Sequence, residues 1–579
     1  LLYNPETKAY LIGVRINKDV LGSKAREKVI GQIEALVYNF GKKNNIEMHI
    51  SGLPLIRTNM AIKVEKEMRW FLVGSVLISA IILLLFFRSV SATVLSLGVV
   101  ITGVIWSMGF MHLFGYNISL LTALIPPLIV VIGIPNCIYF LNKYHTAWLD
   151  TGKKHRALVE MVSRMGIVTL FCNISAAIGF AVFALTKSAI LKEFGMVAGI
   201  SIMAIFFISL AAIPAVLSYL PSPKIKHIKY LETKWLDNAL TLVEKWVFNH
   251  TRVIYIVTAL IIVFSVSGMF RLVSVGHMVD DIPQTDKIYV DLKFFEKHFK
   301  GIMPLEIIVD TKKKYGFTGM KALDVFQKID SLSQYIKVRK GGDNAGNTNT
   351  FQQLMNAFMD STRQKTRISV NMADVGSKAL PPILADIKKR SNELFDSTKF
   401  NVRFTGTSVT FLEGSRFIIS GLQESIMWAF LLIALCMLYL FKSVRILICS
   451  LIPNIVPLML TAGIMGWAGV PLKPSTVLIF GIALGIAIDV TIRFLVNYRQ
   501  ELPANNNMVK PTILQTIHHT GISIIYTSLV LIAGFSIFIF SGFGGTQALG
   551  WLTSLTLLSA TVTNLVLLPV LLKLLHRPK

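Results

Sequence analysis

Long runs of apolar residues, separated by short polar turns, occupy most of this chain. These runs lie at about 70–87, 90–113, 119–141, 165–186, 194–219, 253–272, 426–441, 444–468, 474–498, 518–541 and 546–574. A helix of about 20 apolar residues crosses the hydrocarbon core of a bilayer, so each run predicts one membrane span. The pattern therefore predicts a polytopic α-helical membrane protein with eleven spans.

Two stretches, 1–69 and 273–425, lack such runs and predict α+β soluble domains. In the first, apolar and polar positions predict strands at 9–17 and 46–51 and an amphipathic helix at 23–44. The second is about 150 residues long, which is enough for a domain of its own. In it the stretch 339–350, rich in Gly and Asn, predicts an exposed loop.

A polar linker, 221–252, separates the first group of spans from the rest. Its segment 228–247 predicts an amphipathic helix that lies in the membrane surface or packs on the spans. The whole chain then divides into a soluble part (1–69), five spans (70–220), the linker (221–252), one span (253–272), a second soluble domain (273–425) and five further spans (426–579).

The two halves of the chain repeat one another. Phe87-Arg88-Ser89-Val90 recurs 354 residues later as Phe441-Lys442-Ser443-Val444, and Gly52 recurs as Gly406 with the same offset. Several glycines and prolines of the later spans recur with an offset of 355. Because the offset holds in soluble and membrane parts alike, the chain is a tandem duplication of one parallel unit. The span at 253–272 has no counterpart in the first half. Its equivalent would lie before residue 1, so we expect an intact protein of twelve spans.

The charge pattern sets the expected orientation. The net charge is +26 and 53% of residues are hydrophobic. Basic residues gather in short turns that fall on one side when the spans alternate, as the positive-inside rule requires. We therefore expect these turns in the cytoplasm, both soluble domains outside it, and no nucleic-acid partner. The four cysteines have no metal-ligand spacing, so neither a metal site nor a disulfide framework is expected.

One span carries a buried acid and base. Asp489 and Arg493 follow eleven apolar residues, and a spacing of four puts them on one helix face. Charged groups at membrane depth are costly and commonly functional. The alternatives are a proton-coupling group and a static ion pair that only orients helices.

The motif around this acid resembles a known superfamily. Gly485-Ile486-Ala-Ile-Asp489, followed by Tyr498-Arg499-Gln-Glu501, is similar to the resistance-nodulation-division (RND) transporters, as are the repeat and the two large loops. The opening of the second soluble domain, 280–306, is similar to the MmpL-like and hopanoid-transporter branch of lipid exporters, which is related to Patched and the sterol-sensing proteins.

The resemblance implies a bacterial inner-membrane transporter driven by protons. It would have two periplasmic porter-like domains and would export a lipid or another hydrophobic small molecule. It also leaves open a homo-oligomer or accessory periplasmic proteins as partners. In the family, an acid at the position of Asp489 takes up and releases protons. Two departures stand out: Val490 replaces a Tyr common in the branch, and Asp489 maps in the first half to Pro135, beside Asn136.

Depth along the spans suggests partners for the acid. Thr527 and Ser528 lie at the depth of Asp489, and Asn173 is the counterpart of Ser528. We therefore predict a polar cluster between the two halves, while His518 and His519 are expected near the headgroups. The cluster contains Asp489, Arg493, Thr527, Ser528, Asn136 and Asn173.

The sequence lacks the common catalytic motifs. It contains no phosphate-binding G-x-x-x-x-G-K-[ST] loop, no H-E-x-x-H motif and no nucleophile elbow. We therefore expect a protein that is not an enzyme and needs no cofactor. The remaining alternatives are a sterol-sensing-like lipid receptor or scaffold without transport, and an export accessory of the SecD/SecF type.

Overall fold

The computed structural model describes residues 2–5, 7–23, 25–228, 234–273, 281–299, 303–318, 320–340, 359–372 and 376–575. These residues form two compact units. Unit 1 comprises Leu1–Met60 and Ser274–Arg416, and unit 2 comprises Ala61–Val273 and Phe417–Lys579. Each unit thus contains chain from both halves of the sequence. Most of the predicted loop at 339–350 lies outside the described residues.

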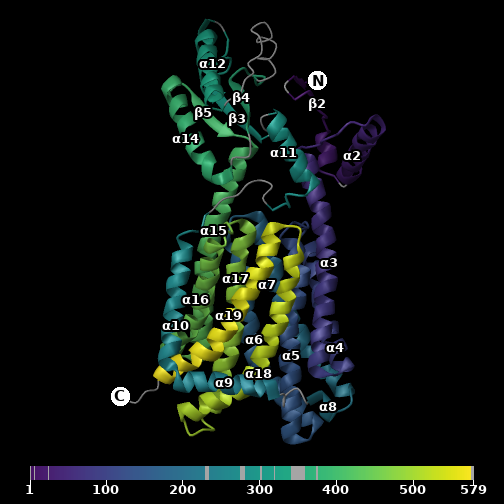
Figure 1. The fold of residues 1–579 in the computed structure, drawn as a ribbon, viewed down its shortest axis with the longest axis vertical. Coiled ribbons are helices and arrows are strands. Elements are labelled where there is room, and N and C mark those ends of the chain that lie inside the picture. The colour runs from purple at the N-terminus through teal and green to yellow at the C-terminus, as the bar shows by residue number, and fades with distance from the viewer. Residues whose placement is uncertain are drawn as a thin grey trace. The chain divides into compact units, whose positions relative to one another are not determined.

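Unit 2 is a helical bundle (Figure 1). Within the described residues, eleven helical segments are long and apolar enough to cross a membrane, which confirms the predicted number. They are α3 (Leu53–Phe87), α4 (Val90–Leu113), η1 with α5 (Thr122–Leu124, Ile125–Thr151), α6 with η2 (Lys154–Ala181, Val182–Leu185), α7 (Ala189–Tyr219), α10 (Thr251–Met269), α15 (Thr407–Phe441), α16 (Val444–Trp467), α17 (Pro474–Glu501), α18 with η5 (Val509–Ser536, Ile537–Phe540) and α19 (Gly544–Leu575).

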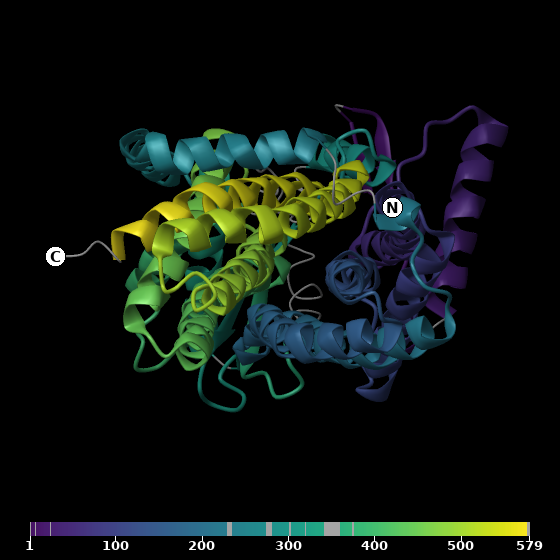
Figure 2. The same cartoon turned by 90° about the horizontal axis from the view of Figure 1, so that it is seen from below.

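The duplication is visible element by element. Helices α3 and α15 are both 35 residues long, and α4 and α16 are both 24 residues long. The turn between the helices of each pair has the same backbone: Arg88 and Lys442 adopt left-handed φ values of 47° and 50°. Ser89 and Ser443 then cap α4 and α16, each accepting a backbone N–H. Seen from below, the blue helices of the first half and the green and yellow helices of the second occupy different sides of the bundle (Figure 2).

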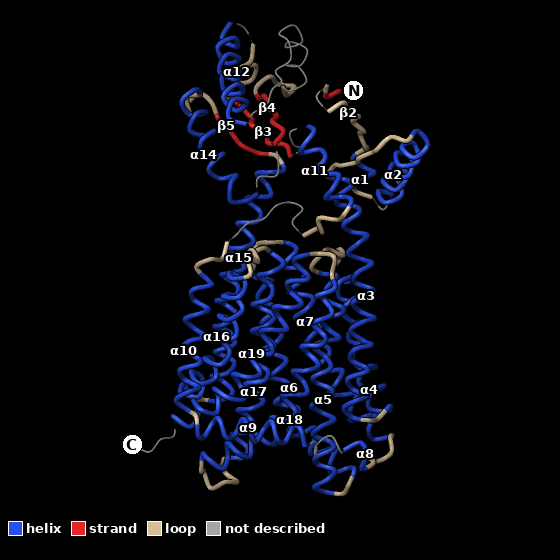
Figure 3. The backbone as a smooth tube through the Cα atoms, viewed as in Figure 1, coloured by secondary structure: helices blue, strands red, loops and turns tan. Residues whose placement is uncertain are grey.

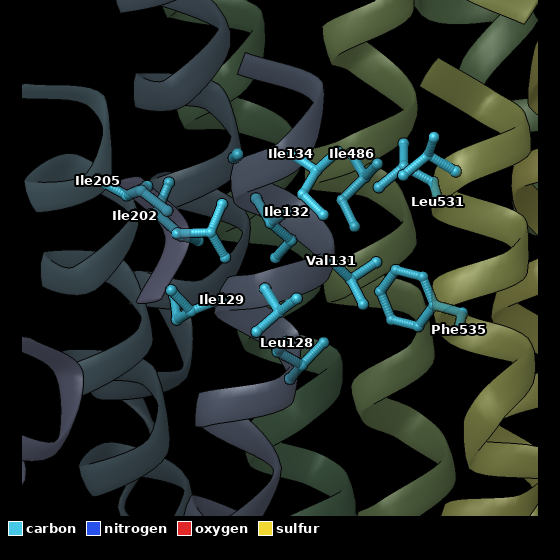
Figure 4. Packing of buried hydrophobic residues seen from close by; sticks show 14 of the residues in the cluster. Leu128, Ile129, Val131, Ile132, Ile134, Ile202, Ile205, Ile486, Leu531 and Phe535 are labelled. Carbon is cyan, nitrogen blue, oxygen red and sulfur yellow. The ribbon is translucent and has the colours of Figure 1, made fainter. Parts of the chain in front are cut away.

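Two equivalent helices, α5 and α17, form the centre of the bundle. All of the apolar window of α5 and 89% of that of α17 are buried. A helix that is apolar on every face belongs inside such a bundle. Figure 4 shows how α5 packs: Ile129 lies toward Ile205 of α7, and Val131 toward Phe535 of α18.

Glycines set the closest helix approaches in unit 2. A Cβ atom at Gly179 of α6 would lie 2.9 Å from the Cα atom of Gly485 in α17. A Cβ atom at its counterpart Gly534 would lie 2.7 Å from the side chain of Val131 in α5. Lipid tails are as apolar as side chains, so close packing of small residues holds helices together in a membrane.

Helix α9 (Lys234–Asn249) lies across the ends of the spans (Figures 1 and 3). It confirms the later part of the helix predicted at 228–247; residues 229–233 lie outside the described residues, after α8 (Ile225–Ile228). Leu236 and Leu240 are buried on its inner face, while Trp235 and Trp246 are exposed. One face therefore packs on the spans and the other keeps aromatic side chains at the surface.

Unit 1 is an α+β structure. Its main sheet has the order β4–β3–β5, with both β4 (Lys365–Met372) and β5 (Asn401–Thr405) antiparallel to β3 (Met303–Asp310). Alternate β3 side chains, Leu305, Ile307 and Val309, are buried in a core with α12 (Met320–Lys340) and α14 (Gly376–Leu394). The unit also contains the hairpin β1 (Leu2–Asn4) and β2 (Ala9–Leu11), with α1 (Lys18–Leu21), α2 (Ala25–Asn44) and α11 (Lys287–Phe299).

The predicted helix at 23–44 is confirmed as α2, but the predictions for its neighbours need correction. The strand expected at 9–17 is only three residues long, because β1 pairs with Ala9–Leu11 alone. The strand expected at 46–51 is wrong. The backbone N–H of Ile50 donates to the carboxylate of Asp291 at 3.3 Å, and His49 contacts the same carboxylate at 2.7 Å. Side-chain acceptors thus take the place of a neighbouring strand.

Candidate functional site in the membrane bundle

An ion pair lies within the central helix α17. The Nε atom of Arg493 donates to Oδ1 of Asp489 at 2.8 Å, one helical turn away. The Arg493 side chain is only 3% exposed and that of Asp489 is 14% exposed. Removing one partner of a buried pair leaves an uncompensated charge, which costs roughly 3–5 kcal/mol. The predicted pair is therefore present, and each charge depends on the other.

Tyr139 of α5 forms the second contact of the guanidinium. The guanidinium carbon of Arg493 lies 3.0 Å from the centre of the Tyr139 ring, a cation–π contact. The Tyr139 hydroxyl lies 3.3 Å from Oγ1 of Thr527. Sequence reasoning missed Tyr139, although the repeat offset of 354 places it at the position equivalent to Arg493. Equivalent positions of the two halves thus meet at the centre of the bundle.

Asn136 and Asn173 form a closed pair beside the acid. Each amide donates to the other, at 2.9 and 3.2 Å, and Asn173 also donates to the carbonyl of Thr169 at 2.7 Å. Both side chains line a small cavity of about 20 Å³ together with Asp489. A cavity of that size, with three polar side chains in a mostly apolar lining, is large enough for one water molecule. The prediction that both asparagines lie near Asp489 agrees with this arrangement.

The predicted hydrogen bonds to Asp489 from α18 are wrong. The Thr527 hydroxyl contacts Tyr139 and donates to the backbone carbonyl of Ser523 in its own helix at 2.9 Å. Ser528 accepts a hydrogen bond from Thr561 of α19 at 2.7 Å. Depth along α18 was the basis of the prediction, but these two residues turn toward α5 and α19. In the described part of the chain, Thr527 therefore touches the site through Tyr139.

A second polar chain, which sequence reasoning missed, runs from α17 to α16 and α19. Asn454 donates to Oγ1 of Thr491 at 2.7 Å, and Thr491 donates to Oδ1 of Asn564 at 2.5 Å. All three side chains are fully buried. The sequence signal that could have revealed this chain is a single Asn within each of two long apolar runs, Asn454 and Asn564. This chain anchors the helix that carries Asp489 to its own half of the bundle.

The two histidines lie in the first half of α18, more than two turns after its start at Val509. His518 contacts Glu244 of α9 at 3.1 Å, and His519 contacts Glu501 of α17 at 3.0 Å. Both therefore pair with carboxylates of neighbouring helices and not with Asp489.

The site contains one carboxylate and few groups for other chemistry. In the part of the chain that the structure describes, no group of three or more His, Cys, Asp or Glu side chains is placed to hold a metal ion. Asp489 is the acid of the cluster, and Arg493, Tyr139 and two amides surround it. Charged groups at membrane depth are costly and commonly functional, so this pair is the candidate functional site of the bundle.

Comparison with known proteins agrees with this architecture. The sequence model of the MMPL family matches residues 4–249 and 282–578, which is nearly the whole chain. A search of curated proteins found no match. The match, the duplicated bundle and the eleven candidate spans agree with one another. The chain therefore belongs to the MMPL family and is a membrane transporter of the RND type.

Proposed function

We propose that this protein exports a lipid-like substrate from the bacterial inner membrane, and that protons drive it through Asp489. MMPL-family transporters handle hydrophobic substrates within the membrane. The observation that carries the proposal is the Asp489–Arg493 pair, buried between the two halves, with Asp489 bordering a small cavity that Asn136 and Asn173 also line. Unit 1 would form the periplasmic part of the substrate path.

Protonation gives the pair two states. With Asp489 charged, the carboxylate holds Arg493 at 2.8 Å. With Asp489 neutral, the guanidinium keeps only the ring of Tyr139 as a specific charge partner. Stranding a buried charge costs roughly 3–5 kcal/mol, enough to favour a different arrangement of α17 against α5 and α6. Proton uptake would thus be linked to a movement of one half against the other.

The coupling would be asymmetric. The position equivalent to Asp489 in the first half is Pro135, and the neighbouring Asn136 pairs with Asn173 and does not titrate. A relay of two acids, one from each half, is therefore excluded. Only α17 would change charge, while α5 and α6 would supply a fixed polar surface.

The test uses purified protein in proteoliposomes that contain a pH-sensitive dye and a fluorescent phospholipid. An imposed pH gradient should produce proton flux and lipid movement in the wild type, and Asp489→Asn should abolish both. Glu160→Gln is the matched control, because it removes a carboxylate paired with Arg164 at 3.2 Å outside the site. Wild-type proton dependence in Asp489→Asn would refute the proposal.

The absence of a second acid also supports an alternative, a lipid receptor or scaffold without transport. Such a protein would bind the fluorescent lipid saturably and show neither flux nor dependence on the gradient. The same proteoliposomes distinguish the two functions. Saturable binding with no movement favours the receptor, and gradient-dependent movement favours the exporter.

A further inference from the structure

A basic cavity lies at one end of unit 2, away from the Asp489 site. It has a volume of about 640 Å³ and lies where α9 ends, α10 begins and α19 ends. The polar side chains that line it include His250, Thr251, Arg252 and Lys573. This end also carries the turns at Arg88 and Lys442, so the positive-inside rule assigns it to the cytoplasmic surface.

The cavity is positively charged. None of the residues that line it is Asp or Glu, and neither Arg252 nor Lys573 forms an ion pair with a carboxylate in the described part of the chain. Lys573 and Lys510 both lie near the ring of Phe248, with their Nζ atoms 5.3 and 5.6 Å from its centre. Three basic side chains thus gather here without acidic partners, and they favour an anion.

The start of α10 adds to this preference. The helix begins at Thr251, and the residue before it, His250, provides no side-chain cap. The first backbone N–H groups of a helix are donors without partners inside the helix and carry partial positive charge. An anion in the cavity would therefore meet backbone donors as well as Arg252 and Lys573.

The surroundings favour a lipid over a free anion. Only 17% of the apolar window of α10 is buried, the smallest fraction among the candidate spans. Val253, which lines the cavity, is 40% exposed, and Ile256 and Val257, further along α10, are 60% and 44% exposed. Leu574 of α19, which lines the cavity, is 54% exposed. The basic cavity is thus continuous with an apolar surface that faces the acyl chains.

We propose that this cavity binds the headgroup of an anionic phospholipid of the cytoplasmic leaflet. Arg252 and Lys573 contact its phosphate, and its acyl chains lie along α10. Basic recesses between spans at the cytoplasmic surface suit such headgroups. The cavity shares no lining residue with the cavity beside Asp489, so the proposal does not depend on that acid.

The experiment counts bound lipid by native mass spectrometry. The protein is placed in nanodiscs of phosphatidylcholine with increasing phosphatidylglycerol. Each surface cation contributes about 1 kcal/mol to the attraction of anionic lipid, so Arg252→Ala or Lys573→Ala should weaken phosphatidylglycerol binding about fivefold, and the double variant about thirtyfold. Arg252→Lys keeps the charge and should bind nearly as the wild type does.

Arg445→Ala is the matched control, because Arg445 is an exposed base at the same end of the bundle but does not line the cavity. It should leave binding unchanged. Equal losses in Arg445→Ala and Arg252→Ala would overturn the proposal, since they would indicate a diffuse surface charge. Displacement of the lipid by millimolar inorganic phosphate would also overturn it, since the cavity would then be a site for a free anion.

Discussion

Replacing Arg493 and Asp489 singly and together should show that the two charges stabilise the bundle only as a pair. Arg493→Met strands the carboxylate of Asp489 among apolar helices. Asp489→Asn strands the guanidinium of Arg493. The double variant removes both charges, so no unpaired charge remains in the bundle.

The structure sets the size of each effect. Asp489 is 14% exposed and borders a cavity that two amide side chains also line, so Arg493→Met should cost about 3 kcal/mol, the low end for a broken buried pair. Arg493 is 3% exposed but keeps the Tyr139 ring, and a desolvated cation–π contact offsets about 2 kcal/mol, so Asp489→Asn should also cost about 3 kcal/mol. The double variant should cost about 1 kcal/mol, because replacing a whole buried pair is often nearly neutral.

The assay is unfolding by sodium dodecyl sulfate in mixed micelles, followed by circular dichroism. We expect the double variant to fall short of the sum of the single losses by about 5 kcal/mol. The control cycle uses Lys143→Met and Glu160→Gln, a more exposed pair separated by 3.5 Å, where the coupling should be below about 1 kcal/mol. Additive losses at Asp489 and Arg493, within about 0.5 kcal/mol, would contradict the reasoning.

Three further predictions concern other parts of the molecule. Tyr139→Leu should slow proton-dependent transport and shift its pH profile, whereas Tyr139→Phe should keep near-wild-type activity. The reason is that the ring of Tyr139, and not its hydroxyl, contacts Arg493. Equal loss of activity in both variants would contradict this. Gly179→Val should separate α6 from α17 and lower the unfolding free energy by about 1–3 kcal/mol, whereas Gly414→Ala, with open space around it, should be neutral. In unit 1, the backbone N–H of Thr398 and then its hydroxyl hold the pKa of Asp396 below its usual value. The carboxylate thus stabilises the native state above about pH 4 and loses this effect as the pH falls through its lowered pKa. As the pH falls, pepsin cleavage near Asp396 should increase in the wild type and should increase less in Asp396→Asn, which lacks the carboxylate.

Several features of this protein were predictable because they depend on local pattern. The eleven apolar segments were predicted from the length of their runs, and the structure contains helices at all of them. The Asp489–Arg493 pair was predicted from a spacing of four, because the geometry of one helix is enough to bring the two side chains together. The duplication was visible in the constant offset, and the matching turns at Arg88 and Lys442 confirm it.

Other features were not predictable from the same information. The segment 46–51 has the alternation of a strand, but the carboxylate of Asp291, which lies far away in the sequence, satisfies the backbone of Ile50. Local alternation does not reveal whether a ladder partner or a side chain will supply the acceptor.

The sequence by itself determined which segments are helices, how deep each polar residue lies along them, and which positions of the two halves are equivalent. Only the tertiary structure decided which way each helix is turned about its axis. The fixed rise of a helix sets depth, whereas the packing of neighbouring helices sets rotation. For that reason Thr527 and Ser528 share the depth of Asp489 but bond elsewhere, and Tyr139, which no motif marks, lies against Arg493.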